Sequence, residues 1–201
     1  ELRAAIGLPS DKTLVAVLPG SREGEVRHLM PVFADAMQLL QARHTGLHFV
    51  IPAANAERHQ QIESVLQSTS LSVSLIRGLG REVMRCSDAI MIASGTATLE
   101  AMLLRKPMVI SYRMAPLSWA ILSRLVETPY VGLPNVLAGE EVVPELLQHH
   151  ATDSQLADAV SGLLGGDSDR QVRRFDELAG LIGGNFAERS IDALLPLVKG
   201  R

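Results

Sequence analysis

Short apolar runs alternate with longer amphipathic stretches along the first two thirds of the chain. The apolar runs predict six strands, at 13–18, 47–51, 73–76, 89–93, 108–112 and 130–132. Apolar residues spaced three and four apart predict helices between them, the longest over 25–43. Strands that alternate with helices indicate βαβ units. We therefore expect an α/β fold, a Rossmann-like parallel sheet of about six strands with helices on both faces.

The pattern changes in the last third of the chain, where apolar positions recur at helical spacing from 142 to the end. We expect residues 1–150 to form a Rossmann-like domain and residues 151–201 to form a helical carboxyl-terminal tail. The chain begins without Met, which indicates a piece of a longer or processed protein.

The composition of the chain disfavours several classes of function. A net charge of −3 and an aromatic content of 3% disfavour a nucleic-acid-binding protein. Cys86 is the only cysteine, which fits a reducing cytosol and excludes an intrachain disulfide. No apolar run reaches the roughly 18 residues of a membrane span. A mean hydropathy of +0.17 leaves peripheral contact with a membrane open.

The loop after the first predicted strand reads Pro19-Gly20-Ser21-Arg22 and leads into a helix. Gly20 permits a tight turn, and the first N–H groups of a helix lack partners inside it. The Arg22 guanidinium has a fork of donors that suits phosphate oxygens. An ordinary turn, with Arg22 paired to Glu23 or Glu25, explains the loop equally well, so alone it indicates only a candidate anion site.

A second loop of this kind, at 93–98, follows the fourth predicted strand. Small residues at Gly95, Thr96 and Ala97 leave room for a ligand at a helix N-terminus. Glu100 lies about one turn further on, where a carboxylate can accept hydrogen bonds from a cis-diol. Capping of the helix by a hydroxyl would explain this loop alone. Two such loops on neighbouring strands, together with a diol-type acid, predict a nucleoside diphosphate site.

Other motifs carry less weight. The segment 78–80 has two glycines after the third strand but lacks the third glycine of a dinucleotide fingerprint. Asn135 follows Pro134 in a loop, where its side chain suits either a ligand or an Asx turn. The Asp-Ser-Asp at 167–169 lies between two predicted helices, where a capping turn is favoured over a metal site. We expect no metal and no cofactor.

Three longer stretches match a known family, in the same order and with similar separations. They read LPGSREGEV, SGTATLEAMLLRKPMVISYRM and YVGLPNVLAGEEVVPELLQ. With them the chain resembles the lipid-A-disaccharide synthase family from about residue 14 to about residue 148. The resemblance implies a GT-B fold, in which two Rossmann-like domains face each other across a cleft. It implies that this chain is the carboxyl-terminal, donor-binding half, with the 151–201 tail packed on a missing amino-terminal domain.

The resemblance also implies a reaction. The family transfers 2,3-diacylglucosamine from UDP to 2,3-diacylglucosamine 1-phosphate (lipid X), forming the β-1,6-linked lipid A disaccharide 1-phosphate and releasing UDP. Such an inverting, metal-independent hexosyltransferase needs a general base, which is expected on the half that this chain lacks. We therefore expect the chain to bind UDP without catalysing transfer.

Matching positions carry the family's UDP contacts onto this sequence. The resemblance assigns UDP binding to Gly20, Ser21, Arg22, Gly95, Thr96, Ala97, Glu100 and Asn135. Tyr112 and Arg113 belong to a stretch expected to line the cleft, and the backbone of Gly78 and Gly80 is the expected uracil edge. No catalytic residue is expected in this chain, where Arg22 stabilises the leaving group.

The implied substrates carry acyl chains, so we expect a cytoplasmic protein, peripheral on the inner-membrane surface. Leu29, Met30 and the apolar stretch 117–122 could face acyl chains, although core packing is favoured. A homodimer swapped through the carboxyl-terminal helices stays open. Two alternative functions also stay open. One is another UDP-sugar GT-B enzyme, such as a UDP-N-acetylglucosamine transferase or epimerase, and the other is a non-catalytic nucleotide-binding module.

Overall fold

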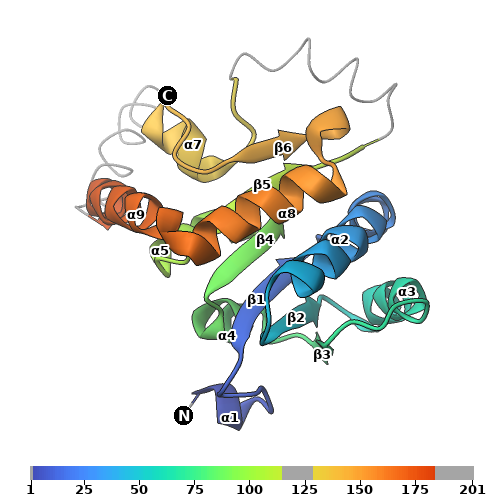
Figure 1. The fold of residues 1–201 in the computed structure, drawn as a ribbon. Coiled ribbons are helices and arrows are strands. Elements are labelled where there is room, and N and C mark those ends of the chain that lie inside the picture. Colours follow the sequence, from blue (N-terminus) through green and yellow to red (C-terminus); the bar gives the residue numbers. More distant parts are fainter. Residues whose placement is uncertain (1, 115–128, 184–201) are drawn as a thin grey trace, which may run out of the picture.

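A six-stranded parallel sheet forms the centre of the computed structural model, which describes residues 2–114 and 129–183 (Figure 1). Its strands are β1 Thr13–Leu18, β2 Leu47–Ala53, β3 Val73–Arg77, β4 Ala89–Ala93, β5 Met108–Tyr112 and β6 Glu145–Leu147. They pair in parallel in the order β3-β2-β1-β4-β5-β6. This is the doubly wound order whose direction reverses between β1 and β4. The expected fold class is confirmed.

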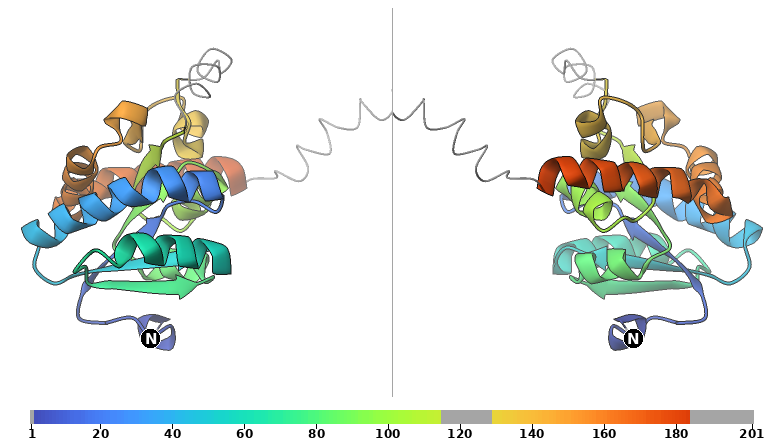
Figure 2. Two further views of the ribbon diagram at one scale, coloured as in Figure 1. Left: turned by 90° about the vertical axis from the view of Figure 1, so that its right-hand side faces the viewer. Right: turned by 90° about the vertical axis from the view of Figure 1, so that its left-hand side faces the viewer.

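Helices connect the strands and cover both faces of the sheet (Figures 1 and 2). They are α1 Leu2–Ala5, α2 Glu23–Arg43, α3 Ala56–Leu66, α4 Gly80–Cys86, α5 Thr96–Leu103, α7 Leu133–Ala138, α8 Asp153–Gly162 and α9 Ser168–Gly183. Helices α2, α3 and α8 share one hydrophobic core with the sheet, and α4, α5 and α9 share the other.

Strand β1 shows how the sequence fills both cores. Val15 and Val17 lie in the core beneath α2, while Leu14 and Ala16 lie in the core on the opposite face, and all four are fully buried. Successive side chains of a strand point to opposite faces, so a strand covered on both faces needs an apolar residue at each position. The unbroken apolar run in the sequence follows directly from this burial.

The sixth strand is not where the sequence predicted it. Residues 130–132 form no strand, and β6 instead lies at 145–147, inside a stretch expected to be helical. The side chains of β6 are only partly buried and the strand begins with Glu145, so it lacks an apolar run. The predicted helix at 117–126 lies outside the described residues.

Helices α8 and α9, from the predicted tail, pack on this sheet; that residues 151–201 also pack on an amino-terminal domain stays a prediction, and 184–201 lie outside the described residues. Leu156 of α8 lies in the core beneath α2, and Phe175 of α9 lies in the opposite core. The buried Gln171 of α9 accepts a hydrogen bond from the Met108 N–H (2.9 Å) and donates to the Met108 carbonyl (3.2 Å). Because α2 and α3 leave β4 and β5 partly uncovered, α8 closes that face.

Two residues considered for acyl-chain contact belong to the core. Leu29 and Met30 of α2 are fully buried beneath the sheet, which confirms the favoured packing role. The stretch 117–122 lies outside the described residues. None of the described helices combines the length and the hydropathy that a membrane span needs.

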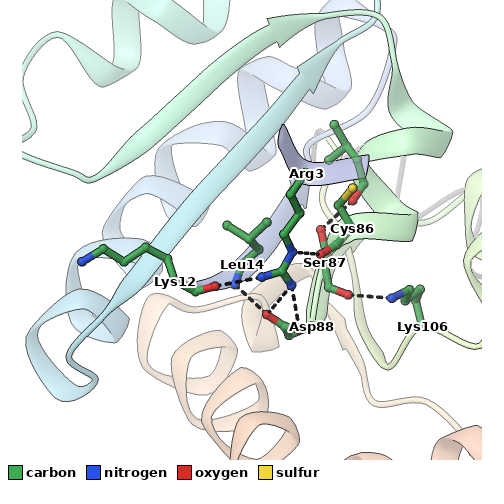
Figure 3. Close-up of polar contacts among 8 residues, drawn as sticks. Arg3, Lys12, Leu14, Cys86, Ser87, Asp88 and Lys106 are labelled. Carbon is green, nitrogen blue, oxygen red and sulfur yellow. Dashed lines mark hydrogen bonds and ion pairs between the residues drawn. The ribbon is translucent and has the colours of Figure 1, made fainter. Parts of the chain in front are cut away.

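Arg3 fastens α1 to the amino edge of the sheet (Figure 3). Its Nε donates to the carbonyl of Cys86 and its Nη1 to the carbonyl of Lys12, both at 3.0 Å. Its Nη2 lies 3.0 Å from each carboxylate oxygen of Asp88. Asp88 also accepts a hydrogen bond from the N–H of Leu14 at 2.8 Å. One guanidinium therefore joins the segment before β1 to the end of α4 and the start of β4.

Replacing Arg3 by alanine should lower the free energy of unfolding by about 2 kcal/mol, because two carbonyls and one carboxylate lose a charged donor. Urea denaturation followed by circular dichroism measures the change. Arg27→Ala is the matched control, since Arg27 pairs with Glu23 on the exposed side of α2 and such pairs contribute about 0.5 kcal/mol or less. Equal losses in the two variants would show that Arg3 adds no more than an exposed ion pair.

Candidate functional site

A cavity of ≈ 420 Å³ lies at the carboxyl ends of β1 and β4, where the strand order reverses. Loops that follow the first four strands form its walls. The predicted residues that line it are Gly20, Ser21, Arg22, Gly78, Gly80, Gly95, Thr96 and Ala97. Open α/β sheets bind ligands in this crevice, and the volume lies in the range of small-molecule sites.

The loop after β1 already holds an anion of its own. The backbone N–H groups of Ser21 and Arg22 both donate to Oε2 of Glu25, at 2.9 and 3.1 Å. Gly20 has a φ of +109°, and a Cβ at this position would collide with the Glu25 carboxylate. The Arg22 side chain is 84% exposed and lies 3.7 Å from the other Glu25 oxygen. For a ligand, this loop therefore offers the Arg22 guanidinium rather than the N–H groups of Ser21 and Arg22.

The loop after β4 keeps its N–H groups available. Ser94 is fixed below it, because its N–H donates to Ser111 O (3.0 Å) and its Oγ donates to Val131 O (2.7 Å). Helix α5 then begins, and the N–H groups of Thr96 and Ala97 have no acceptor within residues 2–114 and 129–183. Unpaired N–H groups and the positive end of the helix dipole favour an anion here.

Glu100 lies one turn further along α5, outside the lining of the cavity. Its side chain is 44% exposed, and Oε1 lies 3.7 Å from Nε of Arg81 in the first turn of α4. Neither carboxylate oxygen accepts a hydrogen bond from the described part of the chain. Both oxygens can therefore accept hydrogen bonds from ligand hydroxyls.

Asn135 is fully buried, and both the nitrogen and the oxygen of its side-chain amide form hydrogen bonds within the protein. Its Nδ2 donates to the carbonyl of Val143 (2.7 Å) and to Glu145 (2.8 Å). Its Oδ1 accepts from the N–H groups of Val142 (2.8 Å) and Val143 (2.9 Å). Asn135 does not line the cavity. The amide therefore holds the loop between α7 and β6 through residues seven to ten positions further along the chain, not through the local Asx turn that the sequence suggested.

The remaining predicted residues lie at the carboxyl end of β5. Tyr112 pairs with Leu147 of β6, and Nε of Arg113 donates to the carbonyl of Gln148 at 3.2 Å. Neither Tyr112 nor Arg113 lines the cavity. Both residues therefore lie beside β6, at the carboxyl end of the sheet.

The structure also adds cavity residues that the sequence did not single out. Pro52, Ala53 and Ala54, at the end of β2, line the cavity, and so does Glu25. Small residues at the end of a strand were an available signal for the β2 loop. For Glu25 the sequence suggested only a partner for Arg22, whereas its hydrogen bonds to the loop N–H groups depend on the backbone turn at Gly20.

Comparison with known proteins connects this chain to a family. A family model described as lipid-A-disaccharide synthetase matches residues 1–192. Lipid-A-disaccharide synthase of Pseudomonas putida (strain W619) is 46% identical over 199 residues, which cover 99% of this chain and 52% of that protein. The chain thus spans about half the length of the curated relative that it matches.

Solved structures share the fold at low sequence identity. UDP-GlcNAc 2-epimerase from Neisseria meningitidis, bound to UDP-GlcNAc, has a TM-score of 0.66 at 16% identity over 97% of this chain and 48% of that one. The C-terminal CMP-Kdo binding domain of WaaA from Acinetobacter baumannii has a TM-score of 0.58 at 13% identity, covering 88% of this chain and 93% of that one. At such identities the likeness shows the fold alone.

Asn135→Ala should lower the free energy of unfolding by about 3 kcal/mol, because it leaves buried backbone groups and Glu145 without partners. Urea denaturation measures the loss. Val136→Ala is the control, because Val136 is 43% exposed on the same helix and its truncation should cost about 0.5 kcal/mol or less. An Asn135→Ala variant of unchanged stability would show that the amide does not hold this loop.

Proposed function

The chain belongs to the lipid-A-disaccharide synthetase family, and on that premise we propose that it is the UDP-sugar-binding part of a lipid-A-disaccharide synthase. One observation carries the proposal. The unpaired N–H groups at the start of α5 and the exposed Arg22 guanidinium line the same cavity, at the point where the strand order reverses. A diphosphate is an anion that suits both sets of donors.

In the proposed complex the N–H groups of Thr96 and Ala97 bind the diphosphate, and Arg22 contacts it from the loop after β1. Gly95, Gly20 and Ser21 form the walls around it and permit a close approach. The carboxylate of Glu100 accepts the ribose hydroxyls, and the uracil lies along the backbone of Gly78 and Gly80. This assignment places the diphosphate between the walls after β1 and β4 and the uracil at the wall after β3, with the ribose toward Glu100 beyond the lining.

Other predicted residues take supporting roles. Asn135 holds the loop between α7 and β6 through its buried amide and does not touch UDP. Tyr112 and Arg113 lie at the carboxyl end of β5 beside β6 and are assigned to the part of the cleft that holds the sugar or its acyl chains. Arg22 stabilises the charge that develops on UDP as the leaving group, so that no metal ion is needed for this purpose.

The complete protein is proposed to transfer 2,3-diacylglucosamine from UDP to lipid X with inversion, at the cytoplasmic face of the inner membrane. The acceptor hydroxyl must lose a proton, and the general base is assigned to the part of the protein that this chain lacks. The chain spans about half of its curated relative, which supports this division. The isolated chain then binds UDP without catalysing transfer.

Calorimetric titration tests the diphosphate contact. We expect Arg22→Ala to weaken UDP binding about tenfold, the effect of losing one charge-assisted contact, and to leave uridine binding unchanged. Arg27→Ala, one turn further along α2, is the control and should bind UDP as the unmodified chain does. The proposal fails if the unmodified chain binds no UDP and the full-length protein binds none at this site.

An activity assay tests whether this chain binds UDP without supplying the general base. With UDP-2,3-diacylglucosamine and lipid X as substrates, the chain alone should release no UDP, while the full-length protein should form the disaccharide. Mass spectrometry of the extracted lipid measures the product. Disaccharide formation by the chain alone, at the full-length rate, would contradict a general base on the other part.

A further inference from the structure

A second guanidinium lies beside the candidate ribose-binding carboxylate. Arg81 belongs to the first turn of α4, and its Nε lies 3.7 Å from Oε1 of Glu100 on α5. Helices α4 and α5 pack into the same core and each begins at a loop that lines the cavity. The pair therefore connects the wall at 78–80 with the wall at 95–97.

The backbone before α4 fixes where Arg81 starts. Gly78 has a φ of +69° and Leu79 a φ of +58°, so two successive residues adopt the left-handed conformation. This conformation is unfavourable for a leucine and persists only where the surrounding fold imposes it. The turn brings α4 back over the sheet immediately after β3, and Arg81 follows one residue into the helix.

The pair contributes little to the stability of the fold. Arg81 is 68% exposed and Glu100 is 44% exposed, and exposed ion pairs add little to the free energy of unfolding. The separation of 3.7 Å exceeds hydrogen-bond length, so the carboxylate oxygens keep their lone pairs for a ligand. The Arg81 charge can therefore act on Glu100 without occupying the lone pairs of its carboxylate.

We propose that Arg81 positions the Glu100 carboxylate for the ribose hydroxyls and offsets its negative charge beside the diphosphate; this inference rests on the proposed binding of UDP. A carboxylate without a partner would repel the diphosphate and would lose rotational freedom when the ribose binds. Arg81 lowers both costs without contacting UDP. It is a positioning residue that acts through Glu100.

The ratio of affinities for UDP and 2′-deoxy-UDP reports the contact between Glu100 and the 2′-hydroxyl. Calorimetry on the 201-residue chain measures this ratio for the unmodified protein, Glu100→Gln, Arg81→Ala and the double variant. We expect a ratio of about ten to fall to about three in Arg81→Ala. In the Glu100→Gln background, Arg81→Ala should have no further effect, because its role passes through that carboxylate.

Two further variants separate positioning from a general loss of structure. Arg81→Lys keeps the charge and should retain a higher ratio than Arg81→Ala. Arg85→Ala removes an exposed arginine one turn further along α4 and should leave the ratio unchanged. All variants should unfold at the temperature of the unmodified chain, since the pair is exposed.

Three outcomes would overturn the inference. If Arg81→Ala leaves the ratio unchanged while the unmodified chain binds UDP, the positioning role is wrong and the UDP site stands. If Arg81→Ala weakens UDP but not uridine and keeps the ratio, Arg81 contacts the phosphates directly. If the unmodified chain binds neither nucleotide and the full-length protein binds no UDP at this site, the proposed function fails together with this inference.

Discussion

Parallel pairing of β1 with β4 determines where the rest of the site can lie. The register places Leu18 beside Ile92, so the two strands end at the same level of the sheet. The loop that begins at Pro19 and the loop that begins at Ser94 therefore flank one cavity, although they are far apart in the sequence. Buried apolar residues on both faces hold this pairing. The strand order reverses between β1 and β4, and this reversal leaves a crevice there.

The two loops look alike in sequence but differ in what they offer to a ligand. After β1, the carboxylate of Glu25 accepts the loop N–H groups and leaves only the guanidinium of Arg22 exposed. After β4, the first N–H groups of α5 keep no internal acceptor within the described residues. The Glu25 carboxylate thus leaves only the Arg22 guanidinium to a ligand in the first loop, whereas the first N–H groups of α5 are free to bind an anion within the described part of the chain. Their combination, rather than either loop, favours a diphosphate.

Burial of the strands on both faces explains which parts of the fold could be predicted from the sequence. The bounds of β1, β4 and β5 were predicted correctly because a strand buried on both faces is apolar at nearly every position. The short edge strand β6 begins with Glu145 and has no such run. The packing of α8 and α9 on this sheet depends on which surfaces α2 leaves uncovered, and local periodicity carries no information about that.

In the candidate site, too, local features could be predicted from the sequence and contacts between elements could not. The two loops that line the cavity could be predicted from strand ends, glycine and arginine, because each of these signals is local. The hydrogen bonds of the Asn135 amide and the approach of Arg81 to Glu100 depend on how separate elements pack together. The sequence alone does not show this packing.

The central claim is that UDP binds with its diphosphate on the first turn of α5. Two-dimensional amide NMR spectra recorded during a UDP titration test it most directly. The account predicts the largest shifts at the amides of Gly95, Thr96 and Ala97, and small shifts at those of Ser21 and Arg22, which stay bonded to Glu25. Largest shifts elsewhere, for example between α8 and α9, with none at the start of α5, would contradict it.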